Sequence, residues 1–196
     1  MSRRILFLDI DGILNCEEAY RRGDCKYVDR IDSKRGKTHH QSFDPIAKGF
    51  LNKLIEQTDA QVVISSTWRS SGLRVMREIW EFEGMSGEVI GITPNFRGDV
   101  EGYTIPRGCE IDAWLRDENF CHINWSKDEQ LKWMEKSNIT NYIIIDDDSD
   151  MLYGQRNHFV HVHPSPRNKN GFCEKYFKEA LTNLNETVIT LNYTND

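Results

Sequence analysis

The chain has 196 residues, of which 38% are hydrophobic and 29% charged, a size and composition ordinary for one soluble globular domain and too short for two full-sized domains with a linker. Its net charge of −6 argues against a generally basic nucleic-acid-binding protein. The five cysteines are odd in number and never form a CxxC pair, which argues against a disulfide framework or a zinc site and favours a reducing compartment. The four apolar residues after Met-Ser-Arg-Arg are too few for a signal peptide or a membrane span, so a cytoplasmic location is expected.

The first motif follows a short apolar run at residues 5–8, which is typical of a buried strand. Asp9 and Asp11 come directly after it, and because strand side chains alternate, both are expected on one side at the carboxyl end of the strand. Ligands bind at that end of an α/β sheet, and two carboxylates this close favour a metal ion or a shared proton between them. A surface turn with two solvated acids is the alternative, and the apolar strand argues against it.

Residues 15–43 show no clean periodicity and carry a local positive charge. Between residues 21 and 40 the net charge is +4, so the remainder of the chain carries about −10. A basic insertion directly after the first motif is placed to close over an anionic substrate, as a small cap that uses Arg21, Arg22 and Arg35. A solvated loop without a role remains the alternative.

The rest of the chain alternates between strand and helix patterns. Asp44 and Pro45 are typical of the first positions of a helix. Further strands are expected at residues 61–64, 89–92, 142–145 and 159–162, and further helices at 71–83, 109–116, 126–137 and 173–184. This alternation predicts a single α/β domain over residues 1–196: a Rossmann-like parallel sheet of about five strands with helices on both faces and the cap insertion after strand one.

Hydroxyl groups and an arginine follow the second strand. Ser65, Ser66 and Arg69 are suited to holding a phosphoryl group, and Trp68 to stacking on a base. Ser66 or Ser70 as a helix cap, and Trp68 as a core residue, are the alternatives.

An acidic run, Asp146-Asp147-Asp148-Ser149-Asp150, follows the fourth strand. A solvated turn or a loose calcium loop would also be acidic, but the further ligands and terminal glutamate of an EF-hand are absent from the sequence. Together with Asp9 and Asp11, the run predicts an oxygen-ligated Mg²⁺ site that suits phosphoryl transfer through an aspartyl-phosphate.

These motifs resemble those of the haloacid dehalogenase (HAD) superfamily of phosphatases. Asp9-Ile-Asp11-Gly12 matches its DxDG motif, Val62-Val63-Ile64-Ser65 its second motif, and Ile143-Ile144-Ile145-Asp146-Asp147 with Asp150 its acidic fourth motif. More narrowly, Ser65-Ser66-Thr67-Trp68-Arg69, Ile90-Gly91-Ile92-Thr93-Pro94 and Arg107-Gly108-Cys109-Glu110-Ile111 resemble the small HAD domains of RNA-repair proteins, which include relatives of polynucleotide phosphatases.

The resemblance implies a role for each acidic residue. Asp9 would be the nucleophile, and Asp11 the acid that protonates the leaving oxygen and then the base for water. Mg²⁺ would be held by Asp9, the backbone carbonyl of Asp11 and Asp146, with Asp147 or Asp150 in support. Ser65 would hydrogen-bond the phosphoryl group.

The third motif of the superfamily supplies a lysine or arginine, and no residue of this sequence matches it unambiguously. Arg107 is the preferred candidate, with Lys127 and Lys132 as the alternatives.

The sequence therefore favours a Mg²⁺-dependent phosphomonoesterase, with a polynucleotide 3′-phosphatase as the leading hypothesis. A phosphorylated nucleic-acid end or a nucleotide would be its substrate, and no obligate protein partner or membrane is implied. The alternatives are a 5′-nucleotidase or small-molecule phosphatase and, from another class, a non-catalytic phosphate-binding or receiver-like module.

Overall fold

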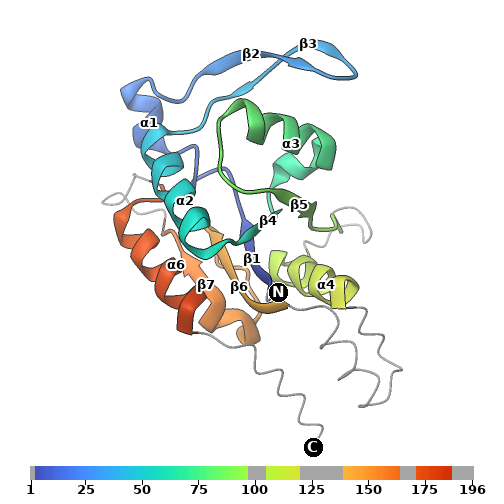
Figure 1. Cartoon of the computed structure of the whole chain (residues 1–196), viewed down its shortest axis with the longest axis vertical. Coiled ribbons are helices and arrows are strands. Elements are labelled where there is room, and N and C mark those ends of the chain that lie inside the picture. Colours follow the sequence, from blue (N-terminus) through green and yellow to red (C-terminus); the bar gives the residue numbers. More distant parts are fainter. Residues whose placement is uncertain (1–2, 97–104, 120–138, 164–170, 187–196) are drawn as a thin grey trace, which may run out of the picture.

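A five-stranded parallel sheet forms the centre of the protein (Figure 1). The computed structural model describes residues 3–96, 105–119, 139–163 and 171–186. The strands lie in the order β5-β4-β1-β6-β7, so the chain begins in the middle of the sheet and extends it on both sides. Their bounds are β1 (Arg3–Leu8), β4 (Gln61–Ile64), β5 (Val89–Ile92), β6 (Ile139–Asp146) and β7 (Phe159–His161).

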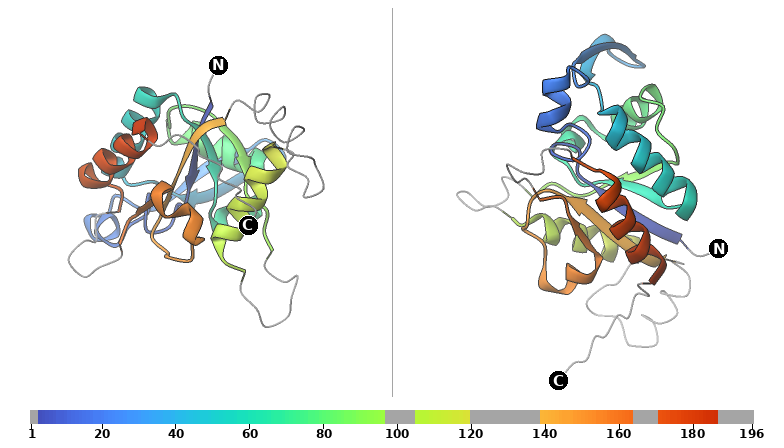
Figure 2. Two further views of the ribbon diagram at one scale, coloured as in Figure 1. Left: turned by 90° about the horizontal axis from the view of Figure 1, so that it is seen from below. Right: turned by 90° about the vertical axis from the view of Figure 1, so that its left-hand side faces the viewer.

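Alternate residues of each strand supply the two hydrophobic cores on either side of the sheet. Leu6 and Leu8 of β1 point into the larger core, beneath α2 (Pro45–Thr58), α3 (Leu73–Phe82) and α6 (Glu174–Glu186). Ile5 and Phe7 point the other way, toward α4 (Arg107–Asn119). The views in Figure 2 show α2 and α6 side by side on one face and α4 on the other. Each fully buried side chain of this kind contributes roughly 1.5–3 kcal/mol, so both cores fix the direction of the central strand.

The helix bounds follow local signals in the sequence. The carboxylate of Asp44 accepts a hydrogen bond from the backbone N–H of Ile46, and Pro45 occupies the first turn, as predicted for the start of α2. Ser66 caps a short 3₁₀ helix, η1 (Thr67–Ser71), and not α3, because η1 occupies the chain between β4 and α3. A second 3₁₀ helix, η2 (Tyr153–His158), precedes β7.

Residues 15–43 form a helix and a hairpin, which the sequence pattern did not indicate. The helix is α1 (Glu17–Arg22), and the antiparallel hairpin is made of β2 (Tyr27–Asp32) and β3 (Gly36–Gln41). The insertion is closed at its base, because the backbone N–H of Asp44 donates to the carbonyl of Leu14 at 2.7 Å.

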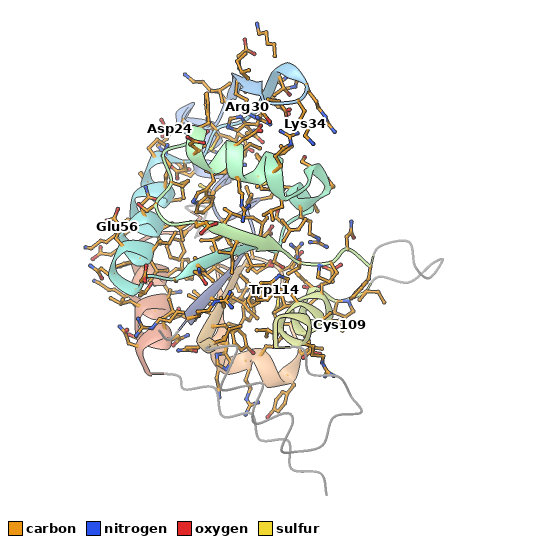
Figure 3. All side chains as sticks on the ribbon, turned by 45° about the vertical axis from the view of Figure 1, so that its right-hand side comes forward. Asp24, Arg30, Lys34, Glu56, Cys109 and Trp114 are labelled. Atoms are coloured by element: carbon orange, nitrogen blue, oxygen red, sulfur yellow. The ribbon has the colours of Figure 1, made fainter. Side chains whose placement is uncertain are left out.

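The hairpin is fixed on α3 and the residue that follows it by a partly buried ion pair and a buried hydrogen bond. Arg30, only 6% exposed, lies 3.0 Å from Glu78, and the ring of His40 lies 2.9 Å from the carboxylate of Glu83. Figure 3 shows Arg30 and Lys34 on the hairpin above α3, whereas Trp114 lies on α4 below the sheet. The positive charge of Arg30 is therefore paired inside the protein and does not belong to an exposed basic surface.

The predicted fold class is confirmed: the structure is an α/β parallel sheet with helices on both faces. The predicted helix at residues 126–137 lies outside the described residues. Within the described part of the chain, no helix is long and apolar enough to cross a membrane. The four cysteines described there, Cys16, Cys25, Cys109 and Cys173, are all free thiols.

Candidate functional site

Three strand ends bring the predicted site residues to one edge of the sheet. Leaving β1, the backbone N–H of Asp9 donates to the carbonyl of Ile145 at 3.0 Å. Leaving β4, the backbone N–H of Ser65 donates to the carbonyl of Leu8 at 2.8 Å. These bonds continue the parallel ladder by one residue, so the residues that follow the three strands are adjacent in space.

A cluster of three carboxylates lies at this edge. Asp9, Asp146 and Asp147 each offer an oxygen within 4.8 Å of the others, and Asp9 and Asp146 are 5% and 0% exposed. Burial raises the pKa of Asp9, and burial together with the nearby charge of Asp9 raises the pKa of Asp146. The pKa of Asp147 is raised by burial and by its neighbour Asp148. Crowded carboxylates of this kind are relieved by a proton or a cation.

The side chain of Asp11 lies apart from this cluster. Asp11 is exposed, and both oxygens of its carboxylate accept from the indole N–H of Trp68 at 3.1 Å. The prediction that Asp9 and Asp11 lie on the same side is therefore wrong, since one carboxylate is buried and the other exposed. The reason is that β1 ends at Leu8, so both residues lie after the strand, where the chain turns back through the hydrogen bond from Gly12 to Asn15, and they do not follow strand alternation. The use of the Asp11 backbone carbonyl as a metal ligand stays a prediction.

Gly12 allows the first loop to pack on the acidic run. Its φ is +75°, and a Cβ atom at this position would collide with the carboxylate of Asp147. A side chain here would meet both backbone strain and a steric clash, so the DxDG pattern has a physical reason to end in glycine.

Arg107 is the cation of the cluster. It is the first residue of α4. Its Nη1 lies 3.4 Å from the carboxylate of Asp9 and its Nε lies 3.4 Å from that of Asp146, and its guanidinium also donates to the carbonyl of Ser65. Asp150 holds the start of this helix, because its carboxylate accepts from the backbone N–H of Arg107 at 2.8 Å. The structure thus brings the preferred third-motif candidate to the site, whereas Lys127 and Lys132 lie outside the described residues.

Two serines line the same edge and differ in their hydrogen bonding. The hydroxyl of Ser65 is fully buried and has no hydrogen-bond partner among the described residues. The hydroxyl of Ser66 accepts a hydrogen bond from the backbone N–H of Trp68. It also donates to Asp9, which offsets part of the rise in the pKa of Asp9 that burial causes. A buried hydroxyl without a partner is costly, so Ser65 is available for a bound oxygen.

Arg69 is engaged inside the protein. It is 5% exposed and pairs with Glu110 of α4 at 2.5 Å, while it also donates to the carbonyl of Ser66. This buried pair ties η1 to α4, and contact of Arg69 with substrate stays a prediction. The sequence gives no indication of this role of Glu110, because no local spacing connects residues 41 positions apart.

The predicted substrate contacts in the insertion differ in their surroundings. Arg21 pairs with Glu17, and Arg22 pairs with Asp24 and with the buried carboxylate of Asp44. Arg35 is exposed at the hairpin turn, where its backbone N–H donates to Asp32 at 2.8 Å. All three arginines are exposed, and the guanidinium groups of Arg21 and Arg22 are engaged in these ion pairs.

The donor set fits a hard divalent cation. The three clustered groups are carboxylates, and Oδ2 of Asp146 is buried without a hydrogen-bond partner among the described residues, with Arg107 Nε at 3.4 Å. Mg²⁺ prefers a few carboxylates together with water and phosphate oxygens. Asp9, Asp146 and Asp147 are the residues that would hold it.

A parallel sheet that carries an Asp-x-Asp-Gly loop, a buried serine and an acidic pair at adjacent strand ends defines a HAD-type domain. The family model for the HAD domain in Swiss Army Knife RNA repair proteins matches residues 5–167, well over half of the chain, and the chain belongs to this family. No curated protein matches the chain at a significant level.

Proposed function

We propose that this protein is a Mg²⁺-dependent phosphomonoesterase that forms an aspartyl-phosphate on Asp9 and acts on phosphorylated nucleic-acid ends. The observation that carries the proposal is the group formed by buried Asp9, Asp146 and Arg107 with half-buried Asp147. It lies beside the hydroxyl of Ser65, which has no hydrogen-bond partner among the described residues. A nucleophile, a cation and a free hydrogen-bond donor lie together there, and these are the groups that transfer of a phosphoryl group through a carboxylate requires.

Each residue has a distinct part in the proposed reaction. A carboxylate oxygen of Asp9 attacks phosphorus, and the bond to the leaving oxygen breaks as Asp11 donates a proton to it. Water then attacks phosphorus and gives a proton to Asp11, which releases phosphate and restores Asp9. Arg107 offsets the negative charge next to Asp9, and Ser65 donates to a phosphoryl oxygen. Bound Mg²⁺ would supply further charge neutralisation.

The family supports the choice of substrate. The chain belongs to a family of HAD domains found in RNA repair proteins. We therefore propose a phosphorylated nucleic-acid end as its substrate, with the 3′-phosphate as the preferred position. Lys34 and Arg35 at the exposed hairpin turn are the cations available to a longer strand. Phosphate contacts of this kind raise affinity without reading sequence.

Phosphate release from a chromogenic phosphomonoester tests the reaction. Wild-type protein should be active with Mg²⁺ and inactive in EDTA, and Asp9→Asn should abolish activity while still folding. Asp146→Asn should also reduce the rise in melting temperature that Mg²⁺ causes in the wild type. Activity that survives in Asp9→Asn contradicts the nucleophile assignment.

Matched oligonucleotides test the substrate. The same sequence with a 3′-phosphate or a 5′-phosphate is compared with the corresponding mononucleotides, and the 3′-phosphorylated strand should have the highest kcat/KM. The double variant Lys34→Ala/Arg35→Ala should raise KM for the oligonucleotide and flatten its salt dependence, whereas Lys178→Ala on α6 should not. Preference for a mononucleotide would overturn the end-repair assignment.

A further inference from the structure

Trp68 makes a directed contact with the exposed acid of the first motif. Its indole N–H lies 3.1 Å from each oxygen of the Asp11 carboxylate, and the hydroxyl of Thr67 lies 3.5 Å from one of them. Within the described residues, these two side chains of η1 are the hydrogen-bond partners of the Asp11 carboxylate. The orientation of Asp11 is thus set by η1 and not by the carboxylate cluster.

The indole ring of Trp68 packs against a buried aromatic side chain. Its ring packs on Phe43 with centroids 5.9 Å apart and planes inclined by 52°, and Phe43 is 1% exposed. The backbone of Trp68 is fixed by the hydroxyl of Ser66, which caps η1 at the end of β4. A rigid ring with one N–H aimed at a carboxylate restricts the rotamers of that carboxylate.

The loop that carries Asp11 fixes only its backbone. The backbone N–H of Gly12 donates to the carbonyl of Asn15 at 3.0 Å, and Leu14 donates to the carbonyl of Ile10 at 2.8 Å. These bonds hold the turn, yet the Asp11 side chain projects from it toward solvent. A proton donor that rotates freely loses much of the benefit of being tethered near the reacting atoms.

We propose that Trp68 is a positioning residue that holds the carboxyl group of Asp11 in the orientation from which it exchanges a proton with the leaving oxygen. The inference rests on the proposed function, and it gives Trp68 a task other than stacking on a base. The single indole N–H is shared by both carboxylate oxygens, which leaves lone pairs of both free to carry the proton.

Leaving-group dependence separates this role from packing. An alkyl phosphate such as glycerol 2-phosphate needs protonation of its leaving oxygen, whereas p-nitrophenyl phosphate leaves as a stable phenolate and needs little. Trp68→Phe keeps an aromatic ring on Phe43 and removes the N–H. It should lower kcat/KM for the alkyl phosphate by about tenfold and that for p-nitrophenyl phosphate by less than about threefold, because positioned general acids contribute roughly 10²–10⁴-fold.

Three further variants make the comparison decisive. Trp80→Phe is the matched control, since Trp80 Nε1 donates to the carbonyl of Ser86 at 3.0 Å and its loss should leave the ratio of the two substrates unchanged. Asp11→Asn should show the same selective loss as Trp68→Phe but a larger one, and adding Trp68→Phe to it should cause little further change. Trp68→Leu provides a second variant without the N–H if Trp68→Phe does not fold.

The outcomes distinguish this inference from the proposed function. If wild-type protein is inactive or Asp9→Asn remains active, the proposed function fails. If Asp9→Asn is inactive and Trp68→Phe lowers kcat/KM equally for both esters, the positioning role is refuted and Trp68 acts through packing. A loss confined to KM for oligonucleotides would refute it in favour of base stacking.

Discussion

Replacing Arg107 by alanine removes the cation that lies 3.4 Å from both Asp9 and Asp146. At an effective dielectric constant of 20, each of these contacts represents a Coulomb attraction of about 5 kcal/mol before any cost of burying the charges. Desolvation offsets much of this, and removal of one partner from a buried ion pair costs roughly 3–5 kcal/mol. Because Asp146 can take up a proton when the cation is lost, we expect Arg107→Ala to lie at the lower end, near 3 kcal/mol.

Urea unfolding measures the free energy of unfolding, in EDTA and again with Mg²⁺. The loss in Arg107→Ala should be smaller with Mg²⁺, because a bound divalent cation supplies positive charge to the same carboxylates. Phosphatase activity with Mg²⁺ should fall by about 10²-fold or more, the usual effect of removing one preorganised charge beside a developing negative charge.

Arg116→Ala is the matched control for this experiment. Arg116 lies on the same helix and pairs with Asp112 at 2.7 Å, but its side chain is 43% exposed. Its removal should change the free energy of unfolding by less than about 0.5 kcal/mol and leave activity intact. If Arg107→Ala behaves like Arg116→Ala in both assays, Arg107 is not the cation of the site.

Two further predictions concern stability. Gly12→Ala should lower the free energy of unfolding in urea by about 2 kcal/mol or more, because a positive φ and the carboxylate of Asp147 both oppose a Cβ atom. Gly49→Ala within α2 is the control and should raise it by about 0.5–1 kcal/mol. Equal effects of the two substitutions would show that the loop at Gly12 is not constrained. Burial raises the pKa of Glu83, but hydrogen bonds, that of His40 first, bring it below its ordinary value. A lowered pKa stabilises the fold above the ordinary range of a glutamate and loses that effect as the pH falls, so Glu83→Gln should lower the melting temperature at pH 7 and differ less from wild type below about pH 4. A difference that is independent of pH would contradict this.

The acidic pair Asp146-Asp147 at the carboxyl end of β6 could be predicted from the local sequence pattern alone. An apolar run followed by aspartates is a feature of consecutive residues, and parallel strands place their carboxyl ends at one edge, so Asp9 and Asp146 could be brought together without knowledge of packing. The strands and the start of α2 were readable for the same reason, because periodicity and capping depend on near neighbours.

The insertion was not readable, because its stability comes from contacts with α3. Its strands are short and polar, and the ion pair of Arg30 with Glu78 and the hydrogen bond between His40 and Glu83 join residues more than 40 positions apart. The sequence showed only the excess of positive charge, and the fold decided which of those charges are buried and paired and which lie exposed at the hairpin turn.

What the sequence by itself determined is the parallel sheet and the identity of the acids, hydroxyls and arginine at its edge. Only the tertiary structure decided how these groups divide: Asp9 buried beside Arg107, Asp11 exposed beside Trp68, and Arg69 buried against Glu110. The physical reason is that side-chain orientation at a strand end is set by the elements packed over it, and these come from distant parts of the chain.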